Sequence, residues 1–182
     1  MTNRLFIALE IPNEAIDQIL LIRDEVYGIP NNVKWEPKSK LHVTLKFLGD
    51  VGENMTELII SQLDKIVFDK FTTGFSQFGI FNKNNIPKIL WIGLNKNKSL
   101  FELHNKVEDT IELLGYQREK RKFTPHITLL RIKGNEDFLK VNSFKEYSLP
   151  KIEFNIEKIL LLKSILKPSG SEYSVIKSFN LI

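Results

Sequence analysis

Cysteine is absent from the sequence, and its absence excludes several kinds of chemistry. Without thiols the chain forms no disulfide, no thiolate zinc site and no iron–sulfur cluster, and it offers no cysteine nucleophile. Long hydrophobic runs are absent too, because the apolar run that starts at Leu5 stops at Glu10 and Pro12, too short for a signal-peptide core or a membrane span. We therefore expect a cytoplasmic protein without a membrane segment.

A large excess of one charge is also missing. The 26 Lys and Arg residues against 22 Asp and Glu give a formal net charge of +4, which suits an anionic partner but is equally typical of a solvated surface. The composition, 42% hydrophobic and 26% charged, is that of an ordinary globular protein. We predict a single domain over residues 1–182, and with no heptad seam in the sequence we expect a monomer.

Hydrophobic periodicity predicts a mixture of helices and strands. Apolar residues at intervals of three or four predict helices over residues 13–27, 53–67 and 100–114, the first of them capped by Asn13. Apolar and β-branched runs between turn residues predict strands over residues 4–10, 33–35, 41–48, 71–81, 88–94, 126–132, 152–155, 157–167 and 173–180. The order strand, helix, strand recurs as a weak internal repeat.

Two of the three histidines stand in the same tetrapeptide pattern. The two copies are His42-Val43-Thr44-Leu45 and His126-Ile127-Thr128-Leu129, and they lie 84 residues apart, close to half the chain. From background residue usage, the chance of two such matches among three histidines is on the order of one in ten thousand. The arrangement therefore indicates two similar halves that each contribute one copy.

This pattern suits acid–base chemistry at a phosphate. On a strand, each histidine and the threonine two residues later project from one face, while Val43, Leu45, Ile127 and Leu129 face the opposite layer. Two imidazoles in one cleft can serve as base and acid, since their unperturbed pKa lies near neutrality. Thr44 and Thr128 would bind the nonbridging oxygens of a phosphodiester held between them. Such hydrolysis requires no metal.

Blander interpretations exist for the same residues. Each histidine, taken alone, is more often a satisfied core or edge residue, and the pairing is what argues against this. A histidine metal site lacks support because no carboxylate lies within two residues of His42 or His126 and no HxxxH spacing occurs. His104, in the predicted helix 100–114, has no threonine at the matching position, and we expect it to be partly exposed without a role.

Charged and aromatic residues near the motifs remain open between two interpretations. The basic run from Arg118 to Lys122 is either a solvated face or an electrostatic guide for an RNA backbone. Arg131 follows His126 at an offset that a regular strand places on the opposite face, unless a bulge brings it round. Aromatic residues that either stack on a nucleobase or belong to the core are Phe6, Phe47, Phe123 and Tyr173.

The sequence, motifs included, resembles a known family. It is similar, over nearly its whole length, to the RNA 2′,3′-cyclic phosphodiesterases of the two-histidine (2H) phosphoesterase superfamily, which are also called 2′-5′ RNA ligase-like. The segments that carry the resemblance are RLFIALEIP (4–12), HVTLKFLG (42–49), PKILWIGL (87–94), KRKFTPHITLLR (120–131) and LLKSILKPSGSEY (161–173). The paired tetrapeptides are its most specific part, and the other segments mainly mark the fold.

The resemblance implies a fold and a reaction. The implied fold is α+β and bilobal, with two antiparallel sheets that form a V-shaped cleft, helices outside and a pseudo-twofold relation between the lobes. The implied reaction is hydrolysis of an RNA 2′,3′-cyclic phosphate end to a 2′-phosphate, without cofactor or metal. Family members also join certain RNA ends through a 2′-5′ linkage.

The resemblance further implies a role for each motif residue. His42 corresponds to the proton donor to the leaving 3′ oxygen, and His126 corresponds to the proton acceptor that activates water. Thr44 and Thr128 would hold the phosphate, and Arg131 matches the substrate-binding arginine that ends the second motif. Leu130 stands where the family usually has alanine, a departure expected to add bulk beside the site and to affect substrate preference.

Two alternatives stay beside this interpretation. The same cleft could bind a nucleotide or an RNA end without turnover, although binding alone needs no acid–base pair. A 2H enzyme could instead act on a small cyclic nucleotide such as ADP-ribose 1″,2″-cyclic phosphate. The basic run from Arg118 to Lys122 slightly favours RNA.

Overall fold

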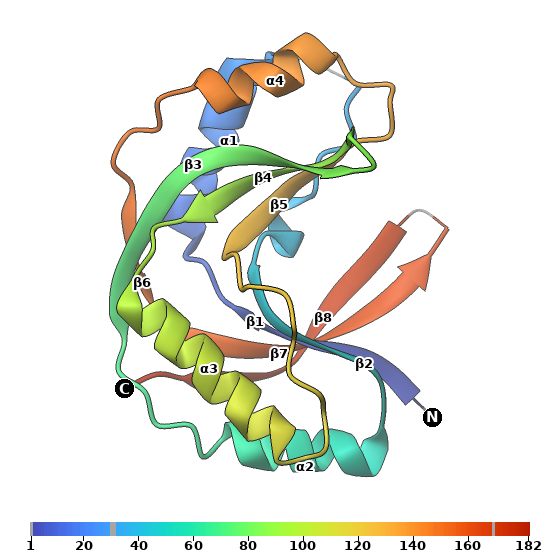
Figure 1. Ribbon diagram of the computed structural model, residues 1–182, viewed down its shortest axis with the longest axis vertical. Helices are drawn as coiled ribbons and strands as arrows, with labels where there is room; N and C mark the ends of the chain where they lie inside the picture. Colours follow the sequence, from blue (N-terminus) through green and yellow to red (C-terminus); the bar gives the residue numbers. More distant parts are fainter. Residues whose placement is uncertain (1, 30–31, 169) are drawn as a thin grey trace.

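Two antiparallel sheets of four strands form the frame of the protein (Figure 1). The computed structural model describes residues 2–29, 32–168 and 170–182. The elements in chain order are β1 (Thr2–Leu9), α1 (Asn13–Tyr27), the short 3₁₀ helix η1 (Lys38–Lys40), β2 (Val43–Gly52), α2 (Glu53–Leu63), β3 (Phe71–Lys83), β4 (Ile86–Leu94), α3 (Lys98–Glu112), β5 (His126–Arg131), α4 (Phe138–Glu146), β6 (Glu153–Ile156), β7 (Lys158–Lys167) and β8 (Gly170–Asn180).

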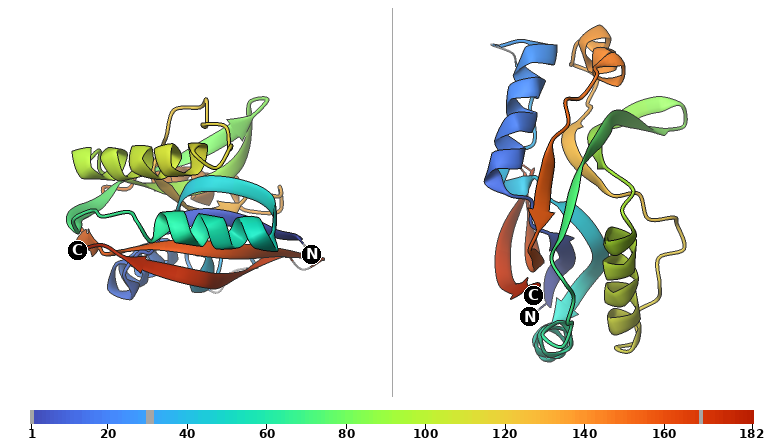
Figure 2. Two further views of the ribbon diagram at one scale, coloured as in Figure 1. Left: turned by 90° about the horizontal axis from the view of Figure 1, so that it is seen from below. Right: turned by 90° about the vertical axis from the view of Figure 1, so that its left-hand side faces the viewer.

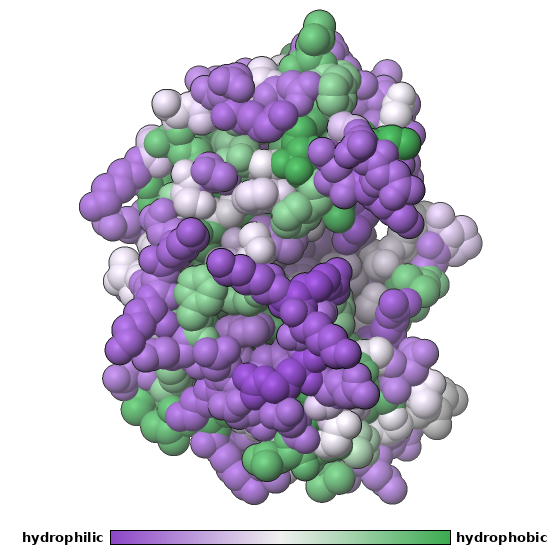
Figure 3. All heavy atoms as spheres, in the orientation of Figure 1, coloured by the Kyte–Doolittle hydropathy of each residue, from purple (hydrophilic) through white to green (hydrophobic). Residues whose placement is uncertain are grey.

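The two sheets divide the chain unequally. The first sheet has the order β2-β1-β7-β8 and so combines early and late strands, whereas the second sheet, β5-β4-β3-β6, comes from the middle of the chain. The sheets diverge on one side of the molecule (Figure 1), where the space-filling view is hollowed between the two halves (Figure 3). This arrangement confirms the expected α+β fold with two antiparallel sheets.

Strand alternation separates the core from the concave face of the first sheet. Leu5, Ile7 and Leu9 of β1 are almost completely buried in the main core. Phe6 and Ala8, which alternate with them, belong instead to a small separate cluster with two leucines of β7. Because side chains alternate along a strand, β1 presents one face to the core and the other to the space between the sheets.

The helices cover the outer sides of the sheets, and two of them pack on the opposite half: α3 follows a strand of the second sheet but packs on the first, and α1 follows a strand of the first sheet but packs with α4 of the second half. α2 and α3 pack against each other and against β2 of the first sheet, whereas α1 and α4 pack together and α4 lies on β3 of the second sheet. The views in Figure 2 show the same two helix pairs from other directions. The units β1–α1–β2 and β4–α3–β5 thus share one order, which confirms the internal repeat.

Several local predictions are confirmed by burial and backbone geometry. In α3, the apolar positions Leu100, Leu103, Val107 and Ile111 are fully buried, as amphipathic spacing predicts. The side chain of Asn97 accepts a hydrogen bond from the amide of Ser99 and so caps this helix. The turn between β3 and β4 has positive φ at two consecutive asparagines, 84 and 85, which suits a two-residue hairpin loop.

Other local predictions were wrong. Among the described residues, the strand expected over 33–35 is reduced to one bridge, between Trp35 and Leu130, because the chain reaches Pro37 at once and proline cannot continue a ladder. Asn13 is the first residue of α1 rather than the residue that caps it. Helix α4 was missed because only Val141 and Phe144 are buried in it, too few for a clear period.

Candidate active site

The two histidines face each other from different sheets. His42 directly precedes β2 of the first sheet, and His126 opens β5 of the second. Thr44 lies opposite Ala8 on β1, and Thr128 lies opposite Trp91 on β4. The charge of His126 lowers the pKa of His42, and Arg131 acts on the pKa of both rings, so the two motifs share one electrostatic environment. The structure therefore brings both motifs into one site.

A β-bulge occurs at the same position of both motif strands. Pairing skips Leu45 in β2, between the pairs Lys46–Ile7 and Thr44–Ala8, and skips Leu129 in β5, between the pairs Leu130–Leu90 and Thr128–Trp91. The extra residue reverses the alternation of side chains beyond it. As a result, the fifth residue after each histidine returns to the face that carries the histidine.

This bulge decides two questions that the sequence left open. Arg131 lies on the same face as His126, and its positive charge lowers the pKa of both histidines, so it belongs to the site. Leu130 is fully buried and pairs with Leu90 on the core side. The expectation that Leu130 adds bulk beside the site was therefore wrong, because the bulge turns it away.

Each imidazole is held by a backbone carbonyl two residues earlier in the chain. His126 Nδ1 donates to the carbonyl oxygen of Thr124 at 2.6 Å. His42 is likewise hydrogen-bonded to the backbone of Lys40. Because a carbonyl oxygen can only accept, Nδ1 of His126 carries a proton, which leaves Nε2 with a free lone pair when the ring is neutral. Neither partner could be identified from the sequence.

Burial sets the charge state of both rings. Burial, which is the largest cause, and the charges of Arg131 and His126 lower the pKa of His42 to about 4. Burial and the charge of Arg131 also lower the pKa of His126. The hydrogen bonds to the backbone oppose these shifts without cancelling them. At neutral pH the free protein thus presents two uncharged imidazoles, and a bound anion would favour protonation.

Aromatic rings surround each histidine. The ring of His42 lies 5.1 Å from that of Phe6 and 5.5 Å from that of Tyr173. The ring of His126 lies 4.8 Å from Phe81 in a T-shaped contact and 6.1 Å from Trp91. The indole of Trp91 packs over Gly79, where a Cβ would come within 2.2 Å of it. These rings supply the desolvation that lowers both pKa values.

The four aromatic residues considered in the sequence analysis lie in different places in the structure. Phe6 is buried, but on the concave face, and Phe47 is 71% exposed beside it. Tyr173 lies against His42. Phe123 is stacked on His104 at 3.9 Å, so its contacts are with α3. Three of the four therefore lie at the candidate site.

An ion-pair cluster joins the two halves of the site. Nε of Arg131 donates to Glu36 at 3.0 Å, and Nζ of Lys40 lies 3.7 Å from the other oxygen of the same carboxylate. The amide of Glu36 also donates to the carbonyl of Leu129 at the bulge. Glu36 thus holds one cation from each half, and the sequence did not indicate it because Arg131 lies 95 residues away in the chain.

The basic run is largely compensated by acidic neighbours. Arg118 is paired with Asp109 and Glu112 on α3, and Arg121 is paired with Glu119. Because both arginines of the run form ion pairs within the protein, the run fits a solvated, structured loop better than an electrostatic guide for RNA.

A buried ion pair anchors the loop between α3 and β5. Nζ of Lys46 donates to Glu108 at 2.7 Å and to the carbonyl of Gln117 at 2.6 Å, and both charged side chains are buried. His104 lies 3.9 Å from the same carboxylate, and its side chain is 12% exposed, in agreement with the expected partial exposure. This cluster fastens the loop before β5 to α3.

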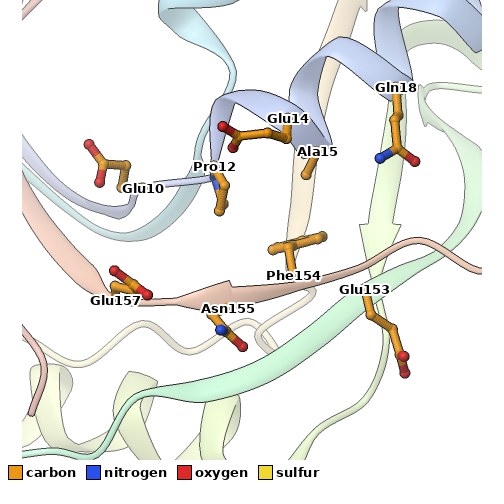
Figure 4. Close-up of a pocket in the computed structure, with 9 residues that line it drawn as sticks. All are labelled: Glu10, Pro12, Glu14, Ala15, Gln18, Glu153, Phe154, Asn155 and Glu157. Carbon is orange, nitrogen blue, oxygen red and sulfur yellow. The ribbon is translucent and has the colours of Figure 1, made fainter.

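Two cavities differ sharply in charge. One, of about 410 Å³, lies between the start of α1 and β6 and is lined by four glutamates, Glu10, Glu14, Glu153 and Glu157 (Figure 4). Glu10 and Glu153 are paired with Lys158 and Lys151, but Glu14 and Glu157 add negative charge that disfavours a phosphodiester. The other, of about 390 Å³, is lined by residues that include Lys40 and Tyr173, and so adjoins His42. Of these two, the second suits an anionic substrate.

No helix in the described part of the chain has the length and apolar character that a bilayer crossing requires. The expectation of a cytoplasmic location remains a prediction.

Comparison with known families and proteins agrees with this site. The 2′-5′ RNA ligase superfamily matches residues 22–167. The chain is 30% identical over 177 residues to the RNA 2′,3′-cyclic phosphodiesterase of Archaeoglobus fulgidus, which covers 97% of this chain and 99% of the relative. It is 32% identical over 178 residues to the protein of the same name from Methanocaldococcus jannaschii, with 97% and 99% coverage.

Solved structures show the same fold. E. coli LigT complexed with 3′-AMP superposes with a TM-score of 0.78 at 23% sequence identity, covering 100% of this chain and 99% of that one. The structure described as TT0787 of Thermus thermophilus gives a TM-score of 0.76 at 24% identity, with 98% and 97% coverage. At these identities the likeness concerns the fold, and it confirms the α+β architecture that the resemblance implied.

Proposed function

Because the chain belongs to the 2′-5′ RNA ligase superfamily, we propose that it hydrolyses the 2′,3′-cyclic phosphate at the end of an RNA to a 2′-phosphate. The observation that carries the proposal is the pair of imidazoles from the two sheets, each hydrogen-bonded to the backbone two residues earlier, with a threonine on the same face as each and the charge of Arg131 acting on both. The curated relatives named RNA 2′,3′-cyclic phosphodiesterase support the substrate.

His126 is assigned the role of general base. Its Nδ1 is occupied by the carbonyl of Thr124, so Nε2 of the neutral ring is free to take a proton from water. The lowered pKa keeps the ring neutral at physiological pH, as a base requires. The oxygen of that water then attacks phosphorus in line with the bond to the 3′ oxygen.

His42 is assigned the role of general acid. Its proton goes to the 3′ oxygen as the phosphorus–O3′ bond breaks, which yields a 3′-hydroxyl and a 2′-phosphate. In the free protein its pKa is about 4. A phosphodiester anion between the rings raises that pKa, because an opposite charge favours the protonated form. Substrate binding thus charges the acid that the reaction consumes.

The remaining residues stabilise the phosphate. Thr44 and Thr128 point from their strands to the same face as the histidines and donate hydrogen bonds to the nonbridging oxygens. Arg131 keeps its terminal guanidinium nitrogens for the phosphate, since Glu36 is bound through Nε. Proton transfer and charge stabilisation are then all supplied by side chains, so the proposed hydrolysis needs no metal.

Joining of RNA ends would use the same groups in the same proton roles, with a 5′-hydroxyl in place of water attacking the cyclic phosphate and the 3′ oxygen leaving. A binding module without turnover has no use for a histidine such as His126, whose Nε2 is kept free to take a proton. Both remain distinguishable by experiment.

The test is incubation of the purified protein with a short RNA that ends in a 2′,3′-cyclic phosphate, in EDTA, with separation of 2′- and 3′-phosphate products. We expect a 2′-phosphate alone, and a loss of about a thousandfold in both His42→Ala and His126→Ala. His104→Gln is the matched control, because that histidine lies on α3 against Phe123. Turnover that requires added metal, or a 3′-phosphate product, would contradict the proposal.

A further inference from the structure

A cavity lies beside His42, at the edge of the candidate active site. It measures about 390 Å³ and lies between η1 and the start of β8, with Ser39, Lys40, Ser171 and Tyr173 in its lining. Its wall is shared with the catalytic centre, because the ring of Tyr173 lies 5.5 Å from that of His42. A molecule bound between the two histidines therefore extends naturally into this cavity.

The lining pairs an aromatic face with a cation. Nζ of Lys40 lies 5.7 Å from the centre of the Tyr173 ring, over its face. Phe6 and His42 both meet Tyr173 at a steep angle and hold the ring in place. The side chain of Lys40 is only 18% exposed, and its ion pair to Glu36 is 3.7 Å long and shared with Arg131. Its ammonium is available to a stronger anion.

The carboxylate in the lining does not oppose an anion. Glu172 is paired with Lys167 at 2.6 Å, at the end of the hairpin where β7 passes into β8. The other polar side chains that line the cavity, within the described part of the chain, are the serine hydroxyls, the Tyr173 phenol and the ammonium of Lys40. The cavity thus has a flat stacking surface, hydroxyls that donate or accept, and one positive charge, which together fit a nucleoside with a phosphate attached.

We propose that this cavity binds the nucleotide at the RNA end, with its base on Tyr173 and, on Lys40, the phosphodiester that links it to the preceding nucleotide. The inference rests on the proposed function and narrows its substrate class. A base that stacks on Tyr173 takes the place where the ammonium now lies, and the flexible lysine stem lets the charge move to the phosphate. A mononucleoside cyclic phosphate lacks that phosphate, so Lys40 makes the site selective for RNA chains.

The experiment compares a dinucleotide that ends in a 2′,3′-cyclic phosphate with the corresponding mononucleoside 2′,3′-cyclic phosphate. For Lys40→Ala we expect the ratio of kcat/KM for dinucleotide over mononucleotide to fall about tenfold, mainly through the KM of the dinucleotide. Loss of one phosphate contact should also weaken the dependence of kcat/KM for the dinucleotide on salt concentration. Lys40→Arg should keep most of the preference.

Lys38→Ala is the matched control. Lys38 belongs to the same turn of η1, but its ammonium is bonded to Asp17 of α1 and so is turned away from the cavity. The ratio for the two substrates should stay at the wild-type value in this variant. A general effect of surface charge would instead lower the ratio in both lysine variants.

Tyr173 tests the stacking half of the proposal. Tyr173→Leu should raise the KM of both substrates about tenfold, as loss of one base–aromatic stack does, whereas Tyr173→Phe should change it little. If Lys40→Ala lowers kcat/KM equally for both substrates, or Tyr173→Leu leaves both KM values unchanged, the inference is wrong while the proposed hydrolysis stands. If the wild-type protein cleaves neither substrate, the proposed function itself has failed.

Discussion

His42 and His126 are presented by the same backbone device, yet the side chains that follow them differ. Both rings are held by the backbone two residues earlier, and both strands bulge at the leucine three residues later. The next two residues are Lys46 and Phe47 in the first sheet but Leu130 and Arg131 in the second. The backbone of the repeat has thus been kept, whereas its side chains have diverged.

The divergence divides the work of the cleft. In the second sheet, the position turned toward the cleft carries a guanidinium, and the position turned toward the core carries leucine. In the first sheet, the cleft position carries an exposed phenyl ring, and the core position carries a buried cation. At this one position, the second half therefore turns a cation into the cleft, and the first half turns an aromatic ring into the cleft and a buried cation toward the loop before β5.

The largest expected effect separates the roles of the two histidines. On an RNA end whose bridging 3′ oxygen is replaced by sulfur, the leaving thiolate needs no proton. His42→Ala, which should lose about a thousandfold on the normal substrate, should recover to within about tenfold of wild type on this one. His126→Ala should stay inactive because water still needs a base. Equal recovery of both variants, measured as kcat, would show that the roles are not divided in this way.

The next effect concerns the buried cation that the first half has and the second lacks at this position. Lys46→Met leaves the Glu108 carboxylate buried without its cation. Its Oε1 already lacks a hydrogen bond among the described residues. We therefore expect the free energy of unfolding to fall by about 3 kcal/mol. The double variant Lys46→Met/Glu108→Leu should recover most of it. Urea unfolding gives the values, and Leu130→Met at the corresponding position is the control, with a smaller loss. A double variant no more stable than the single one would refute this account.

Burial of His42 makes stability depend on pH. Its pKa is about 4 in the folded protein against 6.5 in the unfolded chain, so the unfolded chain binds the proton more readily. The contribution of His42 to the free energy of unfolding is fully present above pH 6.5. About 3 kcal/mol of it is lost as the pH falls toward 4. His42→Asn should lack this part of the pH dependence. Identical slopes for both proteins in chemical unfolding between pH 7 and pH 4 would count against it.

The smallest effect compares the two residues that the bulges turn into the cleft. Arg131→Gln should lower kcat/KM roughly tenfold, the cost of one charge-assisted hydrogen bond, and should flatten its dependence on salt. Phe47→Leu should leave the salt dependence unchanged because no charge is removed. A salt slope that responds to Phe47 and not to Arg131 would reverse the division of work between the halves.

The sequence predicted the parts of this site that depend on local pattern. The paired tetrapeptides and the repeat of strand, helix and strand were legible, as was the buried stripe of α3 at Leu100, Leu103 and Val107. A bulge, however, depends on how a strand pairs with its neighbour. The structure was therefore needed to show that Arg131 points toward the cleft and Leu130 toward the core. The same holds for Glu36, which acts only because distant segments meet.

The order of strands in the first sheet has a consequence for protein synthesis. β1 lies between β2 and β7, although the whole second sheet is translated between β2 and β7. The sheet that carries His42 therefore stays incomplete while the ribosome is still producing the chain, whereas the strands around His126 are already available. A chain built in this way completes the cleft between its two histidines only after β7 has been made.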